Sequence, residues 1–507
     1  MLRVEINTVI EEKKSPIDSA IEQYHIHTSD ILDCRIHHRS LDARSNRQAR
    51  YVYQIDFSVL NEEKYLKRLK QKVRQVEKYV YHAPVAGLMK LEHRPVIVGF
   101  GPAGMASAYL LAAKGYQPIV IERGPNIHHR KKAVNSYWQG NELDEERNVQ
   151  FGEGGAGAFS DGKLTTRIKD ERVPIVLEKL IEAGADESIS WMNHPHIGTD
   201  RFCEIDEKIR QKIIEMGGSI YFDTRLDDLI VENNKLKAIG NGSGDTYRML
   251  TKYLHLENKP FAIGVRVEHL QSFINARQYR NIADYSVLPP AEYHLACKTS
   301  NGKGAYSFCM CPGGYVVPSE SKRNTIVTNG MSYSKRDGKN ANSAIVVQVD
   351  ETDFGKEPLA GLRFQEELEA RAYTIGNGKA PGETIAEYLN ELTNGENIIP
   401  TYARGIKHTD VHAVFSPAIN QSLEDAFHYT ERIFPGFTQN GAFMTAAETR
   451  TSSPVRIVRD IHSLESDLIQ GIYPCGEGAG YSGGIVSSAI DGVKCAEQII
   501  MKYHPID

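Results

Sequence analysis

The sequence predicts an α/β protein built from three parts. Residues 1–90 show the order strand, helix, strand, strand, helix, strand. From residue 95 the pattern changes to strand, glycine-rich turn and helix, which predicts a parallel sheet flanked by helices. This pattern is absent from 256–440, where strands are expected at 261–268, 315–320 and 344–349 and a helix at 364–375. It returns only at Leu468. We therefore predict an α+β domain at 1–90, an α/β domain formed by 95–255 and 441–507, and a mixed α+β domain inserted at 256–440.

The length and composition are those of a globular protein. At roughly 150 residues per domain, 507 residues suggest about three domains. Hydrophobic residues make up 41% and the formal net charge is −5, which excludes a wholly basic nucleic-acid-binding chain and an acidic solvated tail. The seven cysteines contain no CxxC motif, so neither a disulfide framework nor a zinc ribbon is indicated.

Neither a signal peptide nor a membrane span is predicted. The start, MLRVEINTVIEEKK, lacks the apolar core of a signal peptide. The stretch 95–113 carries no charge, but its glycines and prolines favour a strand, a tight turn and a helix over a membrane helix. We therefore expect a cytoplasmic protein with no membrane partner.

The N-terminal part resembles a ferredoxin-like sandwich in its order of elements. Strands are expected at 2–10, 31–41, 49–60 and 76–83, with helices at 15–24 and 61–73. Arginines gather near the central hairpin, at Arg35, Arg39, Arg44, Arg47 and Arg50. Two hypotheses stay open for them: a face that binds phosphate, including RNA, or a solvated hairpin edge.

A Rossmann-like dinucleotide motif follows at residue 94. The run RPVIVGFGPAG is a strand followed by GxGxxG; a helix over 105–115 and a strand ending at Glu122 complete the unit. The glycines permit a tight turn, close approach to a pyrophosphate and close packing of helix on strand, while Glu122 suits a ribose hydroxyl. The cofactor contacts predicted here are Gly99, Gly101, Pro102, Ala103, Gly104, Glu122 and Arg123.

The same glycine pattern recurs at 152–157 and 478–483, and neither copy is a complete dinucleotide-binding unit. No helix is expected directly after 152–157. The copy at 478–483 follows an expected strand, GIYPCGE, and precedes an expected helix over 484–500, but too few residues remain after it for a second unit. The second copy also spells GxSxG around Ser482, the nucleophile pattern of hydrolases. Its acid and base would be Asp491 and His504, which lie within or just after the same expected helix. They could not return to Ser482, so a hydrolase is not predicted.

Six segments together resemble the uncharacterised FAD-dependent dehydrogenases, also described as NAD(P)/FAD-dependent oxidoreductases. They are RIHHRSLDAR, NVQFGEGGAGAFSDGKL, FAIGVRVEH, SFCMCPGGYVVP, GAFMTAAETRTSSPVRIVRD and GIYPCGEGAGYSGGIVSSAIDG, in this order along nearly the whole chain. The resemblance implies FAD as prosthetic group and oxidoreductase chemistry on a small molecule that it does not identify. NAD(P)H is expected at most as a transient electron donor. Relative to the family pattern, the segment before Gly240 is shorter by about one hairpin arm and one strand.

A bound flavin needs contacts from far along the chain, and the glycine-rich segments offer them. The helix expected from about Gly484 would aim backbone N–H groups at the N1/O2 edge of the flavin, and Glu477 would take a ribityl hydroxyl. The segment from Glu153 can lie against the pyrophosphate or the ring. The further predicted contacts are Glu153, Gly154, Gly155, Ala156, Gly157, Ser160, Asp161, Lys163, Gly240, Gly476, Glu477, Gly484 and Ile485.

The candidates for catalysis are few, and each has a structural alternative. Cys309 and Cys311 could form a redox dithiol with Cys475 as third participant, or be small buried residues. Arg450, with Glu448 and Arg456 nearby, could bind a substrate carboxylate or phosphate, or form an ion pair. Lys163 could approach the flavin. The histidines at 128, 129, 194 and 196 lack metal-site spacing, so no metal site is predicted.

The predicted function is an FAD-dependent oxidoreductase that transfers a hydride at flavin N5. Two alternatives remain open: a flavoprotein that acts on RNA through the Arg35–Arg50 hairpin, and a flavin- or nucleotide-binding regulator without turnover.

Overall fold

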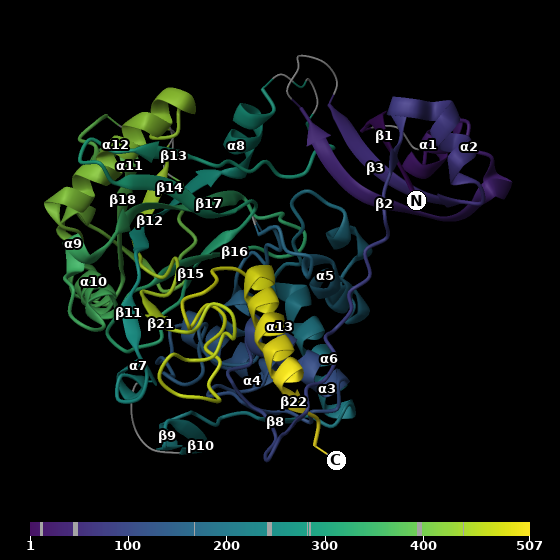
Figure 1. Cartoon of the computed structure of the whole chain (residues 1–507). Helices are drawn as coiled ribbons and strands as arrows, with labels where there is room; N and C mark the ends of the chain where they lie inside the picture. Colours follow the sequence, from purple (N-terminus) through teal and green to yellow (C-terminus); the bar gives the residue numbers. More distant parts are fainter. Residues whose placement is uncertain are drawn as a thin grey trace.

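The computed structural model describes the chain except for residues 11–13, 44–48, 167, 241–245, 281, 283–284, 393–397, 440 and 507. Figure 1 shows a small N-terminal sheet standing beside a larger body, in which the C-terminal helix α13 lies between parts that come from earlier in the chain. No helix of the described chain is both long enough and apolar enough to span a membrane.

The N-terminal unit is a four-stranded antiparallel sheet in the order β2-β3-β1-β4. Its elements are β1 (Leu2–Val9), α1 (Pro16–Gln23), β2 (Ile31–Asp42), β3 (Arg50–Val59), α2 (Glu62–Leu69) and β4 (Arg74–Gln75). The inward side chains of β1, including Leu2 and Ile6, pack on Ile55 and Phe57 of β3. The ferredoxin-like assignment rests on this order and stays a prediction.

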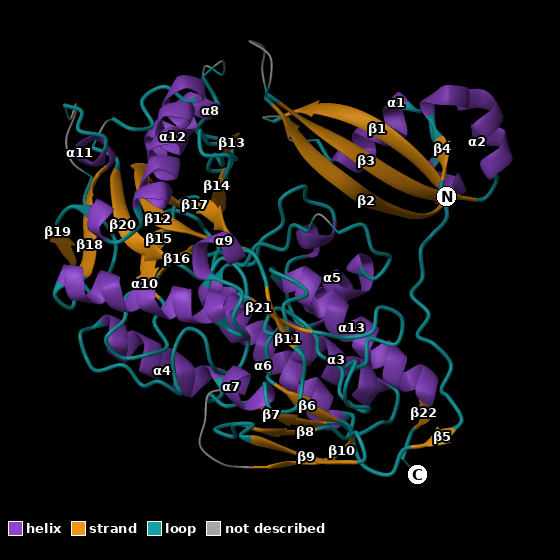
Figure 2. Ribbon diagram, turned by 60° about the vertical axis from the view of Figure 1, so that its left-hand side comes forward, coloured by secondary structure: helices purple, strands orange, loops and turns teal. Residues whose placement is uncertain are grey.

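The last strand predicted for this unit, at 76–83, is wrong in position. Only Arg74–Gln75 pairs in the sheet, and residues 76–83 are irregular. The hydroxyl of Tyr81 donates to Glu497 on α13 at 2.8 Å, so this segment leaves the sheet and contacts the larger body (Figure 2).

The α/β part contains a short parallel sheet in the order β6-β7-β8. Its strands are β6 (Val96–Val98), β7 (Ile119–Ile121) and β8 (Ser219–Tyr221); its helices are α3 (Pro102–Ala113), α4 (Ile127–Trp138), α5 (Val173–Glu182), α6 (Thr199–Glu215) and α13 (Ile485–Lys502). Buried side chains of α3, α5, α6 and α13 form one hydrophobic core. Nearby lie β5 (Met89–Lys90) paired with β22 (Tyr503–His504), the hairpin β9 (Asp228–Glu232) and β10 (Lys235–Gly240), and α7 (Thr246–Leu250).

The strand expected in GIYPCGE is not formed, and this prediction is wrong. Gly471 and Gly476 have φ of +89° and +75°, outside the strand region, and Pro474 has no N–H to donate. Side chains bind the backbone instead: the Pro474 carbonyl accepts from Arg459 at 2.6 Å, and Gly476 N–H donates to Asp491 at 2.7 Å. As a result β6 is an edge strand among the described residues, with Val96 and Val98 exposed.

The inserted part is built on a seven-stranded sheet in the order β13-β14-β17-β12-β20-β18-β19. Its strands are β12 (Phe261–Leu270), β13 (Ala296–Lys298), β14 (Gly304–Cys311), β17 (Asn340–Val349), β18 (Ala380–Thr384), β19 (Ile406–His408) and β20 (Phe443–Glu448). The central strands β12 and β17 are almost wholly buried, as near-continuous apolar runs predict. Because β20 lies inside this sheet, we place the end of the insert after β20 and not at residue 440.

Helices and short strand pairs complete this part (Figure 2). They are α8 (Gln271–Gln278), α9 (Glu351–Phe354), α10 (Ala360–Gly376), α11 (Ile385–Tyr388) and α12 (Pro417–Ile433), with the pairs β15 (Tyr315–Pro318) and β16 (Thr328–Met331), and β11 (Leu256–Asn258) and β21 (Val455–Ile457). The helix and strands predicted within 257–440 all appear, as α10, β12, β15 and β17.

The N-terminal sheet is joined to the α/β part through backbone hydrogen bonds. Arg39 N–H donates to the Trp191 carbonyl at 2.7 Å, and Asn193 N–H donates to the Arg39 carbonyl at 3.0 Å. The Arg39 guanidinium also lies over the rings of Tyr51 and Trp191, at 4.6 and 4.9 Å from their centroids. Arg39 therefore fixes the loop that follows Trp191.

Candidate functional site

The turn between β6 and α3 has the geometry that its glycines predict. Gly99 has φ of +94°, and a Cβ at Gly104 would lie 2.0 Å from the Gly99 carbonyl oxygen, so only glycine lets α3 pack this close to β6. Gly101 is the N-cap of α3, and no side chain caps this end. Free N–H groups and the positive end of the helix dipole are therefore available to an anion.

The glycines in these loops are of two kinds. Some are required because a Cβ would clash with the chain itself, and others have open space beside the backbone, where a ligand could lie. A Cβ at Gly478 or Gly483 would meet no heavy atom within 4 Å, and one at Gly101 would meet only Gly155 Cα, at an ordinary 3.7 Å. None of these three has a left-handed φ. The chain's own packing therefore does not demand glycine there, and a ligand lying close to the backbone would.

The start of α3 packs against the interior of α13 and against the segment that precedes that helix. A Cβ at Gly476 would lie 2.6 Å from Ala103 Cβ, and one at Gly492 would lie 2.1 Å from the Ala103 carbonyl oxygen. The N-cap of α13 is Gly484, again without a side-chain cap. A Cβ at Gly157 would lie 3.2 Å from Ile485 Cγ1 and 4.0 Å from Pro102 Cγ, so both uncapped helix starts adjoin the same loop residue. This junction suits a ligand with several negative charges.

Glu122 follows directly after β7, one residue beyond the end of that strand, and its hydrogen bonds connect the segments of the junction. Its carboxylate accepts from the N–H groups of Phe100, at 2.7 Å, and of Gly124 and Gly152, both at 2.9 Å. It is 6% exposed. A carboxylate offers about four acceptor positions, so one remains for a ribose hydroxyl.

The loop at 152–157 lies across the junction and is held by Arg130, a residue that the sequence analysis missed. The guanidinium is fully buried and donates to the backbone carbonyls of Asn148, Val149, Gly152, Glu153 and Gly155 at 2.6–3.3 Å. Burial lowers the pKa of Arg130 to about 10, so it stays charged at neutral pH. No sequence motif predicts this role, because the partners of Arg130 are backbone carbonyls, which every residue has.

Several side chains predicted to touch the cofactor are committed to the protein. Glu153 accepts from Ile127 N–H and from Arg210 Nε, both at 2.8 Å, so only its backbone can face a ligand. Arg123 forms a bidentate pair with Glu146 at 2.7 and 2.8 Å. Ser160 Oγ donates to the Gly157 carbonyl at 2.8 Å and holds the turn that follows Ala156.

On the α13 side, a Cβ at Gly157 would lie 3.2 Å from Ile485 Cγ1, which brings the loop at 152–157 to the start of α13. The Glu477 side chain has accessible surface, but protein atoms surround its carboxyl group. Desolvation by these atoms raises the pKa of the carboxyl, and the nearby charge of Lys259 lowers it by less. Lys259 is a neighbour that no sequence pattern pointed to.

Beyond the loop, four charged side chains from three segments form a buried cluster, defined by Asp161, Lys163, Glu292 and Arg336. Arg336 donates to Asp161 at 3.2 Å and to Glu292 at 2.8 Å. Lys163 Nζ lies 3.8 Å from Asp161 and 3.6 Å from Glu292, and donates to the Met310 carbonyl. Burial lowers the pKa of Lys163, but the two carboxylates outweigh it and the net shift is upward.

Cys309 and Cys311 lie beside this charged cluster. Their sulfurs are 3.9 Å apart, and the Cys311 thiol donates to the Cys309 carbonyl at 3.2 Å. Cys309 has φ of +45° at an irregularity in the β14–β17 pairing, which brings both thiols near one another. The neighbouring Cys311 sulfur and the charges of Arg266 and Lys163 lower the pKa of the Cys309 thiol, whereas burial raises that of Cys311.

The remaining catalytic candidates are in structural pairs. Arg450 forms a bidentate pair with buried Glu369 at 2.8 and 2.9 Å, the ion-pair alternative of the sequence analysis. Glu448 pairs with fully buried Arg266 at 2.8 Å. The thiol neighbour of Cys475 is Cys495.

Two sequence expectations fall partly outside the described residues. Gly240 ends β10, and residues 241–245 after it are not described. Of the hairpin arginines, Arg44 and Arg47 lie outside the described residues, while Arg35 pairs with Asp56 at 3.5 Å and Arg39 packs on Trp191.

Comparison with known proteins identifies the family. Residues 260–451 match the family described as FAD-dependent protein, C-terminal domain-like. An uncharacterised protein of Clostridium beijerinckii is 39% identical, with 98% of each chain covered. Residues 260–451 therefore belong to this family of FAD-dependent proteins, and the whole chain is a relative of the Clostridium beijerinckii protein. The strands β12, β14, β17 and β20, together with Cys309, Cys311 and Arg336, lie in the matched region.

More distant likenesses are partial. A thiamine thiazole synthase of Sulfolobus acidocaldarius is 26% identical over 174 residues, which are 33% of this chain and 51% of that enzyme. The glycine oxidase structure from Bacillus cereus is 12% identical, with 80% of this chain and 95% of that chain covered, at a TM-score of 0.30. That score is too low to carry an argument.

The residues present fit FAD. The matched family is FAD-dependent, and the junction of α3, α13 and the loop at 152–157 offers two uncapped helix starts and glycines at 101, 478 and 483 whose Cβ positions the chain itself does not crowd. Glu122 and Glu477 supply acceptors for hydroxyl groups at either side of these glycines.

Proposed function

We propose that this protein is an FAD-dependent oxidoreductase acting on a small molecule. The observation that carries the proposal is the pairing of the two helix starts with glycines that the chain's own packing does not require. Bound FAD would supply hydride or electron transfer at its ring.

The chain's own residues would bind and orient the cofactor. The N–H groups at the start of α3 would hold the pyrophosphate, and those at the start of α13 would face the electron-accepting end of the ring. Glu122 would accept from the ribose, and Glu477 from the ribityl chain. Arg130 would act indirectly, by holding the carbonyls of the loop at 152–157 so that its backbone can lie against the cofactor.

The substrate would approach the side of the flavin bordered by Lys163 and Cys309. The charged cluster there contains two cations and two carboxylates, so it offers no net charge to select an anionic substrate. Arg450 is neutralised by Glu369, and we do not assign it a substrate carboxylate. Selection would then rest on shape and hydrogen bonding.

The test begins with the purified full-length protein. We expect a visible flavin spectrum, release of FAD rather than FMN on denaturation, and identification of the released compound by mass spectrometry. Anaerobic mixing with NADH and with NADPH then measures whether either reduces the bound flavin, for which we expect slow, saturable kinetics without tight binding. Protein that takes up no FAD when reconstituted would refute the proposal.

A panel of candidate reductants and acceptors separates enzyme from regulator. Steady-state flavin turnover with any donor supports the oxidoreductase. Bound FAD that no donor reduces would favour the regulator, and a salt-sensitive gel shift with RNA would favour the RNA-acting alternative.

A further inference from the structure

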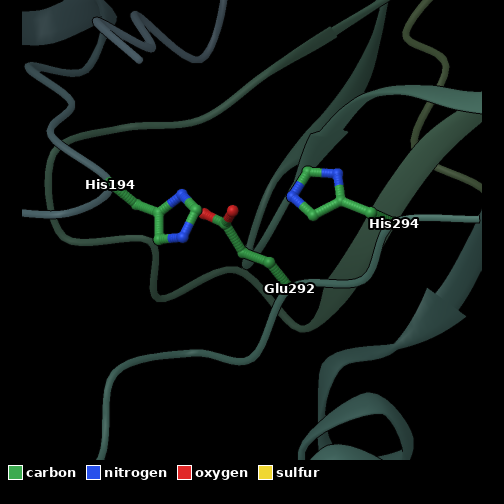
Figure 3. A group of neighbouring side chains, drawn as sticks. All are labelled: His194, Glu292 and His294. Carbon is green, nitrogen blue, oxygen red and sulfur yellow. The ribbon is translucent and has the colours of Figure 1, made fainter. Parts of the chain in front are cut away.

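Three side chains that can bind a metal ion converge beside the charged cluster. Figure 3 shows the ring of His194 against the carboxylate of Glu292, with the ring of His294 turned toward the same carboxylate. One ligand atom from each residue lies within 4.8 Å of the other two. In a tetrahedral site with bonds of about 2.0–2.2 Å, ligand atoms are roughly 3.4 Å apart, so small side-chain rotations would close the site.

The loop that carries His194 is fixed on both sides of the residue. Before it, Asn193 N–H donates to the Arg39 carbonyl of the N-terminal sheet at 3.0 Å. After it, the Pro195 carbonyl accepts from Leu164 N–H at 2.9 Å, and His196 bonds the Ser334 carbonyl at 3.2 Å. A ligand on a backbone held this way loses little entropy on binding a metal.

The segment that carries Glu292 and His294 is fixed as well. Ala291 N–H donates to Asn275 at 2.9 Å, and Leu295 N–H donates to Ser307 on β14 at 2.9 Å. Tyr293, between the two ligands, is buried in the core of the insert. Both ligands thus project from a short segment anchored at its two ends and at its middle.

The two oxygens of Glu292 have different neighbours. Oε1 accepts from Arg336 at 2.8 Å, as metal-binding carboxylates are commonly held by an outer donor. Oε2 has Lys163 Nζ at 3.6 Å, beyond hydrogen-bond distance.

We propose that His194, Glu292 and His294 form a binding site for one divalent transition-metal ion, with Zn²⁺ as its representative. Two imidazoles and one carboxylate form a ligand set used for Zn²⁺ and Fe²⁺, and it leaves positions for water or substrate. Both histidines are exposed, so the ion would be open to solvent on that side.

A second group of potential ligands serves as a control. Glu383, Asp410 and His412 also bring three ligand atoms within 4.8 Å. Both ring nitrogens of His412 are already engaged, by Asp410 at 2.9 Å and Glu424 at 3.1 Å, and Glu383 accepts from Val411 N–H. The ligand atoms of this group are already occupied by hydrogen bonds within the protein, so we do not assign it a metal.

The experiment titrates the full-length protein, after treatment with a chelator, with Zn²⁺ by calorimetry and with Co²⁺ by visible absorption. We expect one equivalent in the wild type. His194→Ala and His294→Ala should each weaken binding by more than roughly 100-fold, the upper range for losing an outer partner alone, and should remove the Co²⁺ bands. His412→Ala should change neither. Lys163→Met removes the competing cation nearest to Glu292 and should strengthen binding.

Circular dichroism and thermal unfolding check that each variant is folded; both target histidines are exposed, so their substitution removes no core contact. The proposal is overturned if the wild type binds no more metal than the His194→Ala/His294→Ala double variant, or if His412→Ala removes the bound equivalent. Metal content and flavin content are measured on the same samples. Absence of metal binding would therefore leave the proposed FAD site testable, and absence of FAD would leave the metal site testable.

Discussion

The junction of α3 and α13 and the charged cluster beside it are built by opposite means. At the junction the groups offered to a ligand are backbone N–H donors and empty space beside glycines. In the charged cluster, Asp161, Lys163, Glu292 and Arg336 offer side-chain charges that largely neutralise one another. Added side-chain atoms would therefore disrupt the junction, whereas removal of a charged group would disrupt the cluster.

This difference determines how each region should respond to substitution. A backbone site keeps its donors whatever its side chains do, so only bulk or a shifted loop removes function. A buried charged network depends on every member, because removing one partner leaves an uncompensated charge. Added bulk should therefore be decisive at the junction, and lost charge in the cluster.

The largest effects are expected at two glycines three residues apart. Gly104→Val should give no folded protein, because its Cβ would lie 2.0 Å from the Gly99 carbonyl oxygen. Gly101→Val should fold, since the nearest atom to its Cβ is at 3.7 Å, but should lose FAD because the side chain fills the space for the pyrophosphate. Flavin absorbance per protein and thermal unfolding measure both.

Gly101→Ala is the matched control and should retain most of the fold and part of the flavin. Full flavin occupancy in folded Gly101→Val would show that this turn does not hold the cofactor, and would remove the contrast between the two glycines.

In the charged cluster, Arg336→Met should lower the free energy of unfolding by about 3–5 kcal/mol, the range for breaking a buried ion pair. The carboxylates of Asp161 and Glu292 would keep only Lys163, at 3.6–3.8 Å. Arg336→Lys, which keeps the charge but not the fork of donors, should cost less. Urea unfolding measures the stability of both variants. Equal stability of Arg336→Met and the wild type would show that Arg336 is not needed to neutralise Asp161 and Glu292.

The sequence predicted the junction well because its signal is local. Gly99, Gly101, Gly104 and Glu122 sit at fixed offsets around one helix, and the structure keeps that arrangement around α3. The helix α13 was equally clear from its apolar periodicity, but the strand expected before it was wrong, since Gly471 and Gly476 adopt positive φ. Short apolar runs do not reveal which turn their glycines make.

The charged cluster could not be predicted, because its members come from segments that only the fold brings together. Lys163 and Asp161 were expected at the flavin, but Glu292 and Arg336 carry no local pattern. Arg130 was missed for a related reason: its partners are carbonyls, which every residue has. The histidines at 194 and 294 are a hundred residues apart, so a search for local spacing finds no metal site.

The carboxyl group of Asp206, below the loop at 152–157, is a buried charge-bearing group that lacks the ion pairs of the charged cluster. Asp206 is buried beneath Gly154, and its Oδ2 has no hydrogen-bond partner among the described residues. Burial and the adjacent Glu153 raise the pKa of Asp206 well above its usual value, against the opposing charge of Arg130. The folded state therefore holds a proton that the unfolded state releases above about pH 4.

Stability from Asp206 is full below that pH and is lost as the pH rises toward the folded-state pKa, by about 1.4 kcal/mol for each pH unit. Asp206→Asn stays neutral and should lose this slope, becoming more stable than wild type at neutral pH. Urea unfolding from pH 4 to 8 measures both proteins. Parallel pH profiles would mean that Asp206 is not protonated in the folded protein.

The smallest effect is expected at the thiols beside the charged cluster. Cys309 and Cys311 have sulfurs 3.9 Å apart, far from the roughly 2.0 Å of a disulfide, and the buried Cys311 thiol already donates to a carbonyl. We expect Cys311→Ser to cost roughly 1–3 kcal/mol in unfolding free energy, for a buried hydroxyl that is poorly paired, and to leave flavin reduction unchanged. Anaerobic titration should then take up two electrons per flavin, since a dithiol relay would take up four. A folded Cys309→Ser/Cys311→Ser variant whose reduced flavin no longer passes electrons to an acceptor would instead establish the thiols as redox partners.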